Sequence, residues 1–233
     1  MKPLLLLVAG AVVTFAQVDL SGAWSPSRAT GPGAPAPPTP ILLKPAYKGA
    51  YDAQKAKERA ATARGEQLAT KGLCSPYGMP TMMQVAVYPM EVIQTPKQIT
   101  MVAEAFSEVR RVYVGKEQAP IDDVPPGYYG RSVGKWEGDT LVVDTVGIKE
   151  SVPGYQGMPH SDQMRITERI RRPSPDALHD QITIEDPVVL EKPVTYTLVY
   201  KLLPDYEMVE FVCDNNREYI DENGIVRMRL HDN

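Results

Sequence analysis

The stretch GRSVGKWEGDTLVVDT, residues 130–145, decides the fold that the sequence predicts. Two runs rich in β-forming residues flank Gly138, and a glycine can adopt the left-handed conformation that a tight reversal between antiparallel strands requires. The acidic residues on either side of it, Glu137 and Asp139, then lie in a solvated turn and need no catalytic explanation. We therefore interpret the stretch as a β-hairpin.

The same stretch contains a G-x-S-x-G pattern around Ser132, of the kind that frames the nucleophile of α/β-hydrolases. That nucleophile lies where a strand turns sharply into a helix, whereas Ser132 is followed by a second strand. Ser132, Asp144 and His160 follow the hydrolase order, but they are close together in the sequence, while the hydrolase fold spreads them widely. A catalytic triad is therefore the less favoured interpretation.

Short runs of Val, Ile, Thr and Tyr, cut by Gly, Pro and Asp about every ten residues, continue from Met82 to the C-terminus. Closing so many antiparallel strands into a ring removes their exposed edges. We therefore predict a mainly β fold, an antiparallel up-and-down barrel, with a tight turn at Asn223–Gly224. The expected strands are residues 82–94, 98–105, 108–115, 131–136, 140–147, 163–171, 181–186, 194–203, 207–214 and 217–230.

The segments before the barrel are expected to be appendages. Residues 1–16 have one lysine, an apolar run and small residues, a pattern typical of a secretory signal and too short to span a bilayer. Residues 17–45 are rich in Pro, Ala and Gly and predict an extended arm. Residues 46–72 are rich in Ala, Lys, Glu and Arg and predict one peripheral helix. The barrel domain is assigned to residues 73–233.

Composition limits the partners and the compartment. The net charge is −4 and the basic residues are scattered, so we expect no nucleic-acid partner. The signal pattern predicts a secreted or periplasmic protein without an integral membrane segment in the mature chain. In an oxidising compartment, the only two cysteines, Cys74 and Cys213, predict one disulfide, with two separate buried thiols as the alternative.

Several acidic residues share a strand face with aliphatic residues and are predicted to point inward. A carboxylate is costly to bury alone, so each of these acids needs a partner, a raised pKa or water. Of the adjacent Arg110 and Arg111, one must point inward in a regular strand. A lumen lined with such acids, with Arg111 and with Tyr113 is predicted to bind a small molecule, and internal ion pairs are the alternative. The acids concerned are Glu104, Asp144, Glu168 and Glu210.

His160 is the histidine with a candidate chemical role, because it lies in a loop that leads into the strand of Glu168. A histidine at a barrel mouth can exchange protons near neutral pH, so His160, Glu168 and Asp144 are the candidate catalytic residues. A histidine that only pins its loop is the alternative. His160 and Asp162 supply only two metal ligands, and no cofactor motif is present, so we expect neither a metal nor a cofactor.

A series of motifs resembles an uncharacterised family of secreted bacterial proteins, and WEGDTLVVDT with PHSD is its most specific part. The resemblance covers most of the chain after the signal and implies a calycin-like (lipocalin-like) barrel; no activity is assigned to the family. Its members often have a His-Pro pair where this chain has Ala119–Pro120, so the resemblance supports no two-histidine chemistry here. The motifs are DLSGAW, CSPYGMP, YPMEVIQTP, RRVYVG, GRSVGKWEGDTLVVDT, PHSDQMRITERIRR, TIEDP and CDNNRE.

Three functions remain open on the sequence alone. The first is a secreted or periplasmic barrel that binds a small ligand in its lumen. The second is a cofactor-independent hydrolase, lyase or isomerase in which His160 and an inward carboxylate transfer protons. The third is a non-catalytic envelope or interaction protein. The sequence sets neither the identity of the ligand nor the oligomeric state.

Overall fold

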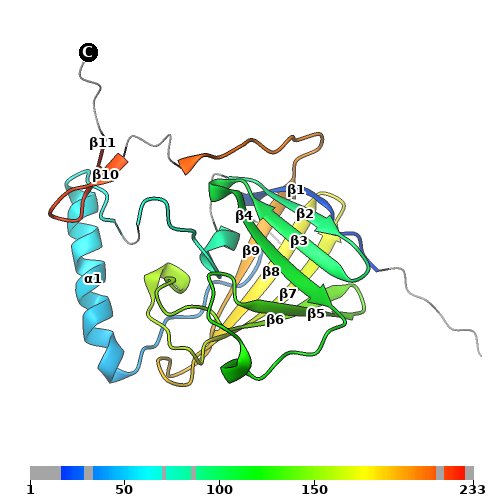
Figure 1. The fold of residues 1–233 in the computed structure, drawn as a ribbon, viewed down its shortest axis with the longest axis horizontal. Coiled ribbons are helices and arrows are strands. Elements are labelled where there is room, and N and C mark those ends of the chain that lie inside the picture. Colours follow the sequence, from blue (N-terminus) through cyan, green and yellow to red (C-terminus); the bar gives the residue numbers. More distant parts are fainter. Residues whose placement is uncertain (1–16, 29–33, 70–71, 85–87, 214–217, 229–233) are drawn as a thin grey trace, which may run out of the picture.

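The computed structural model describes residues 17–28, 34–69, 72–84, 88–213 and 218–228 (Figure 1). The expected signal segment, residues 1–16, lies outside this part. Within the described ranges, no helix combines the length and the apolar character that crossing a membrane requires.

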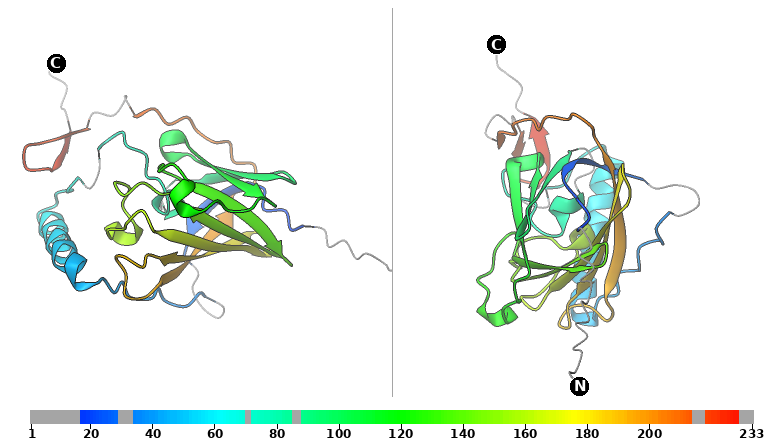
Figure 2. Two further views of the ribbon diagram at one scale, coloured as in Figure 1. Left: turned by 60° about the horizontal axis from the view of Figure 1, so that its bottom comes forward. Right: turned by 90° about the vertical axis from the view of Figure 1, so that its right-hand side faces the viewer.

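The main body of the fold is a closed barrel in which each strand pairs with its neighbours in sequence and β1 pairs with β9 (Figures 1 and 2). The expectation of a mainly β, closed barrel is confirmed. The strands of the barrel are β1 (Gly22–Ser27), β2 (Met90–Gln94), β3 (Gln98–Ala103), β4 (Glu108–Val114), β5 (Arg131–Glu137), β6 (Thr140–Val146), β7 (Arg165–Ser174), β8 (Ala177–Glu185) and β9 (Val194–Leu202).

One pair of strands breaks the up-and-down order. Neighbouring strands in the barrel are antiparallel except β4 and β5, which run parallel with Val112 opposite Ser132. Around a closed ring the strand direction must return to itself, so the number of antiparallel pairs must be even, and nine strands cannot all alternate. Residues 115–130 provide the long crossover that a parallel pair needs, and they include the 3-10 helix η3 (Ile121–Asp123). A purely antiparallel barrel is therefore the wrong expectation at this pair.

The barrel begins earlier in the chain than the sequence suggested. β1 lies inside the segment expected to be an arm, and it pairs with both β2 and β9. Trp24 of β1 is fully buried and donates a hydrogen bond from Nε1 to the carbonyl oxygen of Leu20 (3.0 Å). This strand was not predicted because the residues after it are rich in proline. In addition, the adjacent residues Ala23 and Trp24 of β1 are both buried, so the strand lacks the alternation of buried and exposed residues.

Two other expected strands differ from the structure. The first half of the expected strand at residues 82–94 contains the 3-10 helix η1 (Thr81–Gln84), whose Met82 and Met83 are buried in the core. In the expected strand at 207–214, the described residues 207–213 form no strand. The tight turn at Asn223–Gly224 is confirmed: it joins β10 (Glu218–Ile220) to β11 (Val226–Met228), and Gly224 has φ 76°.

The peripheral helix is also confirmed, as α1 (Pro45–Ala63), and it stands beside the barrel in Figures 1 and 2. Ala61 is its buried residue, which agrees with the thin apolar face of the sequence. The helix ends earlier than expected because Gly65 adopts φ 72°, a left-handed conformation that stops the helix before residue 72.

The disulfide between Cys74 and Cys213 is present, with a Cα–Cα distance of 5.7 Å. It ties the segment before η1 to the segment after β9. Two further 3-10 turns, η2 (Ala105–Ser107) and η4 (Tyr155–Gly157), lie between strands.

One hydrophobic core fills the barrel. It takes buried side chains from all nine strands of the ring except β5, and it continues into Met79, Met82, Met83 and Tyr155 from segments outside the strands. Aliphatic and aromatic side chains thus occupy much of the lumen that was expected to hold a ligand.

Candidate functional site

The most unusual feature inside the barrel is a buried ion pair between Arg110 of β4 and Glu168 of β7. The side chains are 1% and 0% exposed. The Arg110 Nη1 donates to Glu168 Oε1 (2.7 Å) and Nη2 donates to Oε2, so the guanidinium holds the carboxylate with two parallel bonds. Glu168 therefore points inward, as its place in the strand pattern predicted, and the alternative of an internal ion pair is confirmed for this acid.

Two hydroxyl groups complete the surroundings of Arg110. Its Nε donates to Ser132 Oγ (3.2 Å), and its Nη2 donates to Ser132 Oγ (3.1 Å) and to Thr145 Oγ1 (3.0 Å). The two hydroxyl oxygens lie 2.8 Å apart. The serine of the G-x-S-x-G pattern thus supports a buried arginine, which agrees with the interpretation of that stretch as a hairpin.

Asp180 of β8 is the second inward acid, and sequence analysis missed it. It is completely buried, and neither of its carboxyl oxygens has a hydrogen-bond partner among the described residues. Burial and the charge of nearby Glu168 raise the pKa of Asp180 well above its ordinary value, against a smaller opposing effect of Arg110. Two ionised carboxylates only accept hydrogen bonds, so Asp180 can bond to Glu168 only when it carries a proton.

A proton on Asp180, which its raised pKa favours, makes the group of Arg110, Glu168 and Asp180 electrically neutral. The sequence contained a signal for Asp180, because Leu178, Asp180 and Ile182 alternate on one face of β8. The expected strand began at residue 181, just after it.

Two tyrosines of β9 close this cluster from one side. Tyr196 accepts a hydrogen bond from Gln84 Nε2 (2.7 Å), and its ring stacks on that of Tyr155 with centroids 4.0 Å apart. Tyr200 donates to the carbonyl oxygen of Met83. Burial first, and then the charges of Asp180 and Glu168, raise the pKa of both phenols well above the ordinary value, so both stay protonated. The charged cluster has no exposed surface on which a ligand could rest.

Two residues expected in the lumen lie outside it. Arg111 and Tyr113 point outward from β4, because Arg110 is the arginine that takes the inward position. The adjacent pair was correctly expected to divide between the two faces, but the choice of Arg111 as the inward residue was wrong.

Three expected acids also have other partners. Asp144 faces outward, where Arg165 donates to both of its carboxyl oxygens (2.6 Å each). Glu104 lies outside the strands and accepts hydrogen bonds from the Tyr206 hydroxyl (2.7 Å) and the Val209 amide (3.0 Å). Glu210 is exposed in the segment that forms no strand. None of these three carboxylates lines the lumen.

His160 is buried in its loop, and both ring nitrogens lie close to backbone carbonyl oxygens. Nδ1 is 2.9 Å from the oxygen of Ser161, and Nε2 is 2.7 Å from that of Val152. A neutral ring can donate to one of them and a protonated ring to both. The structure thus gives His160, Glu168 and Asp144 separate partners and does not bring them together; the contacts of His160 match the alternative of a loop-pinning residue.

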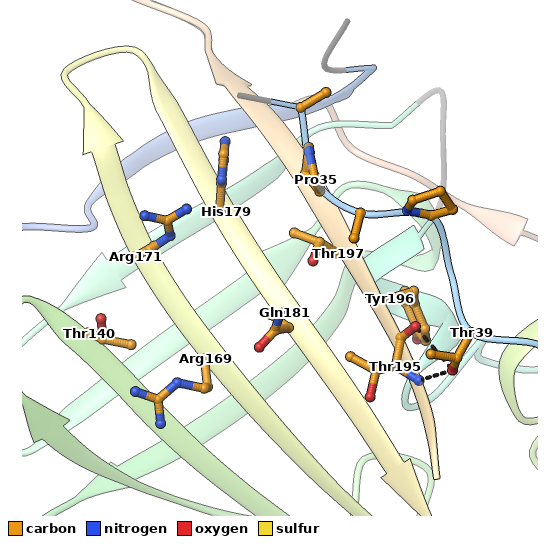
Figure 3. A pocket seen from close by; sticks show the side chains of 13 residues that line it. Pro35, Thr39, Thr140, Arg169, Arg171, His179, Gln181, Thr195, Tyr196 and Thr197 are labelled. Atoms are coloured by element: carbon orange, nitrogen blue, oxygen red, sulfur yellow. Dashed lines mark hydrogen bonds between the residues drawn. The ribbon is translucent and has the colours of Figure 1, made fainter. Parts of the chain in front are cut away.

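An open groove lies on the outer face of the barrel, over β7, β8 and β9 (Figure 3). We call it the arm groove, because residues 34–39 of the Pro-rich arm form one wall. Its volume is about 430 Å³. It is lined by Ala34, Pro35, Ala36, Pro37, Thr39, Thr140, Arg169, Arg171, His179, Gln181, Thr195, Tyr196 and Thr197.

The arm is fixed to the edge of β9 at one point. The Thr39 amide donates to the carbonyl oxygen of Thr195 (2.9 Å), and the Thr195 amide donates to Thr39 Oγ1 (2.7 Å). A segment far away in the sequence thus becomes the wall of a groove whose floor is a rigid sheet. The sequence predicted an extended arm, but its contact with the sheet could not be predicted.

The groove is rich in positive charge. Arg169 pairs with Glu137 outside the groove (3.1 Å), whereas the side chain of Arg171 makes no hydrogen bond or ion pair with any residue that the structure describes. His179 lies opposite Arg171 on the neighbouring strand. Partial burial and the charge of Arg171 lower the pKa of His179, so it is mainly neutral at neutral pH.

Among the described residues, no three or more His, Cys, Asp or Glu side chains are grouped as a metal site would require. In comparisons with known proteins, the chain matches no family model and no curated protein.

Proposed function

We propose that this protein is an exported barrel protein that binds a small molecule in the arm groove and not in its lumen. The observation that carries the proposal is the groove itself, a hollow of about 430 Å³ with polar side chains on its floor. This volume falls within the range of about 300–1,000 Å³ that is typical of small-molecule sites. A calycin-like origin and export through the predicted signal are parts of the same proposal, and the disulfide is compatible with export.

The build of the groove favours binding over catalysis. Its floor consists of three neighbouring strands of the barrel, which hold Gln181, Thr195 and Thr197 in fixed positions. Its wall is an arm that contributes mostly proline and alanine surface, and Thr39 fixes that arm to the sheet. Such a site can hold a molecule between a polar floor and an apolar wall.

The acid–base alternative has less support. The carboxyl groups of Glu168 and Asp180 are 0% exposed, and His160 contacts backbone carbonyl groups. A general acid or base must come within hydrogen-bond reach of its substrate.

The test compares two tryptophan variants of the exported protein by native mass spectrometry of small molecules that co-purify with it. Thr197→Trp fills the groove, whereas Thr100→Trp places the same ring on the outer face of β3, outside the groove. We expect a bound small molecule in the wild type and in Thr100→Trp, and its loss in Thr197→Trp. Equal retention by both variants, or no bound molecule in the wild type after screening of a metabolite library, would refute the proposal.

A further inference from the structure

Basic side chains lie next to one another in the arm groove, on two adjacent strands. In the sheet, Thr140, Arg171 and His179 lie opposite one another on β6, β7 and β8, and Arg169 lies opposite Gln181. Side chains directly opposite on antiparallel strands have Cβ atoms about 5 Å apart, so the Arg171 guanidinium and the His179 imidazole can reach the same ligand atom. Figure 3 shows both side chains on the same face of the sheet.

The lining of the groove has no compensating negative charge. It contains two arginines and one histidine, and no aspartate or glutamate is among its lining residues. Glu137 neutralises Arg169 from outside, at the exposed end of β5. Arg171 is left with its full charge and with all of its guanidinium donors unused by described residues.

From this arrangement we infer that the arm groove binds the oxyanion group of a small molecule, a carboxylate, phosphate or sulfate, with Arg171 as its main contact and His179 as the second. This inference rests on the proposed function and names its ligand class. The flat guanidinium of arginine matches the two oxygens of such a group with two parallel hydrogen bonds. The hydroxyls of Thr140 and Thr197 and the amide of Gln181 then offer hydrogen bonds to the rest of the molecule.

A bound anion should couple to the protonation of His179. In the free protein, partial burial and the charge of Arg171 lower the pKa of His179. The charged groups nearest to His179 on the outer face are Arg169 and Arg171 of β7 and Lys201 of β9, and Glu137 is engaged by Arg169. Arg165, Asp144 and Glu185 lie at the other end of the same face, where Arg165 pairs with Asp144. Residues 34–39 of the arm carry no ionisable side chain. An anion beside Arg171 offsets its charge and favours the protonated imidazole, so binding should take up a proton and strengthen as the pH falls.

The first experiment follows the ring signals of His179 by NMR during pH titration, with inorganic phosphate, sulfate, acetate or neutral acetamide as probes. We expect an oxyanion to raise the apparent pKa of His179 and acetamide to leave it unchanged. The oxyanion that raises the apparent pKa of His179 at the lowest concentration is the preferred group. The ring signals of His160 provide an internal reference, because that histidine is buried in its loop and is not among the residues that line the groove.

The second experiment compares Arg171→Gln with Arg111→Gln, a matched change of an exposed arginine on the outer face of β4. Because a charge-assisted bond contributes more than a neutral one, we expect Arg171→Gln to weaken binding of the preferred oxyanion at least about tenfold, and Arg111→Gln to leave it unchanged. Arg171→Lys keeps the charge without the planar fork and should recover part of the affinity. Thermal unfolding of each variant checks that the fold is retained.

The possible failures are distinguishable. If Thr197→Trp removes the co-purifying molecule while Arg171→Gln retains it and no oxyanion shifts His179, the groove binds a ligand that is not held as an anion, and this inference is wrong. If Thr197→Trp has no effect either, the proposed function itself is wrong.

Discussion

Arg110 and Arg171 carry the same guanidinium group in opposite surroundings. In the lumen, Arg110 donates to Glu168, Ser132 and Thr145, and it is closed off from water. In the arm groove, Arg171 is exposed and has no described partner. A guanidinium whose donors are all used stabilises the protein that surrounds it, whereas one whose donors are unused is available to a ligand. Arg110 therefore has a structural role in the lumen, whereas Arg171 is the arginine that we propose to contact a ligand.

The largest expected effect is on the lumen side of this comparison. Arg110→Met should lower the free energy of unfolding at pH 7 by about 3–5 kcal/mol, because removing one member of a buried ion pair leaves the other charge without compensation. Urea denaturation measures the change.

The neighbouring residue provides the control for this prediction. Arg111→Met makes the same chemical change one position along β4, where the side chain points outward, and it should alter the free energy of unfolding by less than about 0.5 kcal/mol. Equal effects of the two substitutions would show that the buried pair does not stabilise the barrel.

Asp180→Asn tests whether the lumen carries a retained proton. The folded protein keeps the proton on Asp180 at pH values where the unfolded chain has released it, so the unfolded state binds fewer protons and the stability of the wild type falls as the pH rises. The decrease starts near the ordinary pKa of 3.8 and has a limiting slope of about 1.4 kcal/mol per pH unit.

The asparagine variant keeps a hydrogen-bond donor next to Glu168 at every pH. The free energy of unfolding of the variant minus that of the wild type should therefore increase between about pH 4 and pH 8, as measured by urea denaturation at several pH values. Asp139→Asn, in the exposed turn of the β5–β6 hairpin, is the control. A pH-independent difference for Asp180→Asn would mean that Asp180 is ionised in the folded protein.

The smallest effect is expected in the arm. Thr39→Val removes the hydroxyl oxygen that accepts from the Thr195 amide and should lower the free energy of unfolding by about 1 kcal/mol. Hydrogen exchange at the Thr195 amide should become faster as the arm loosens from β9. Thr167→Val, on the outer face of β7, is the matched control; an unchanged exchange rate in Thr39→Val would contradict the assignment of Thr39 as the anchor.

Local features of this fold could be predicted from the sequence. The β5–β6 hairpin follows from alternating residues around Gly138, and the strands from β3 to β9 lie close to their expected positions, except that β8 begins at Ala177 and not at residue 181. Global features could not. Pleating requires one of Arg110 and Arg111 to point inward but does not say which, and the parallel β4–β5 pair follows from closure of the ring, which no single strand encodes. The length of residues 115–130 was the available signal, since a hairpin needs only a few residues.

The buried ion pair in the lumen could be predicted from the sequence in part, whereas the arm groove could not. The inward direction of Glu168 follows from the alternation within β7, and the physical demand for a partner was correctly anticipated. The arm groove depends on contact between Thr39 and Thr195, two residues without any sequence pattern in common. A groove built from distant segments therefore cannot be predicted from local sequence patterns, whereas an inward acid indicates an ion pair because burying it alone is costly.

The pairing of β1 with β9 has a consequence for the order in which the molecule can be completed. β1 is among the first segments to emerge during synthesis, but one of its two neighbours is the last strand of the barrel. Until β9 arrives, the backbone groups along one side of both β1 and β8 have no strand to bond. A nascent or truncated chain therefore has two unpaired strand edges that the complete barrel lacks. A chaperone that accompanies the unfinished chain would have to shield these two edges.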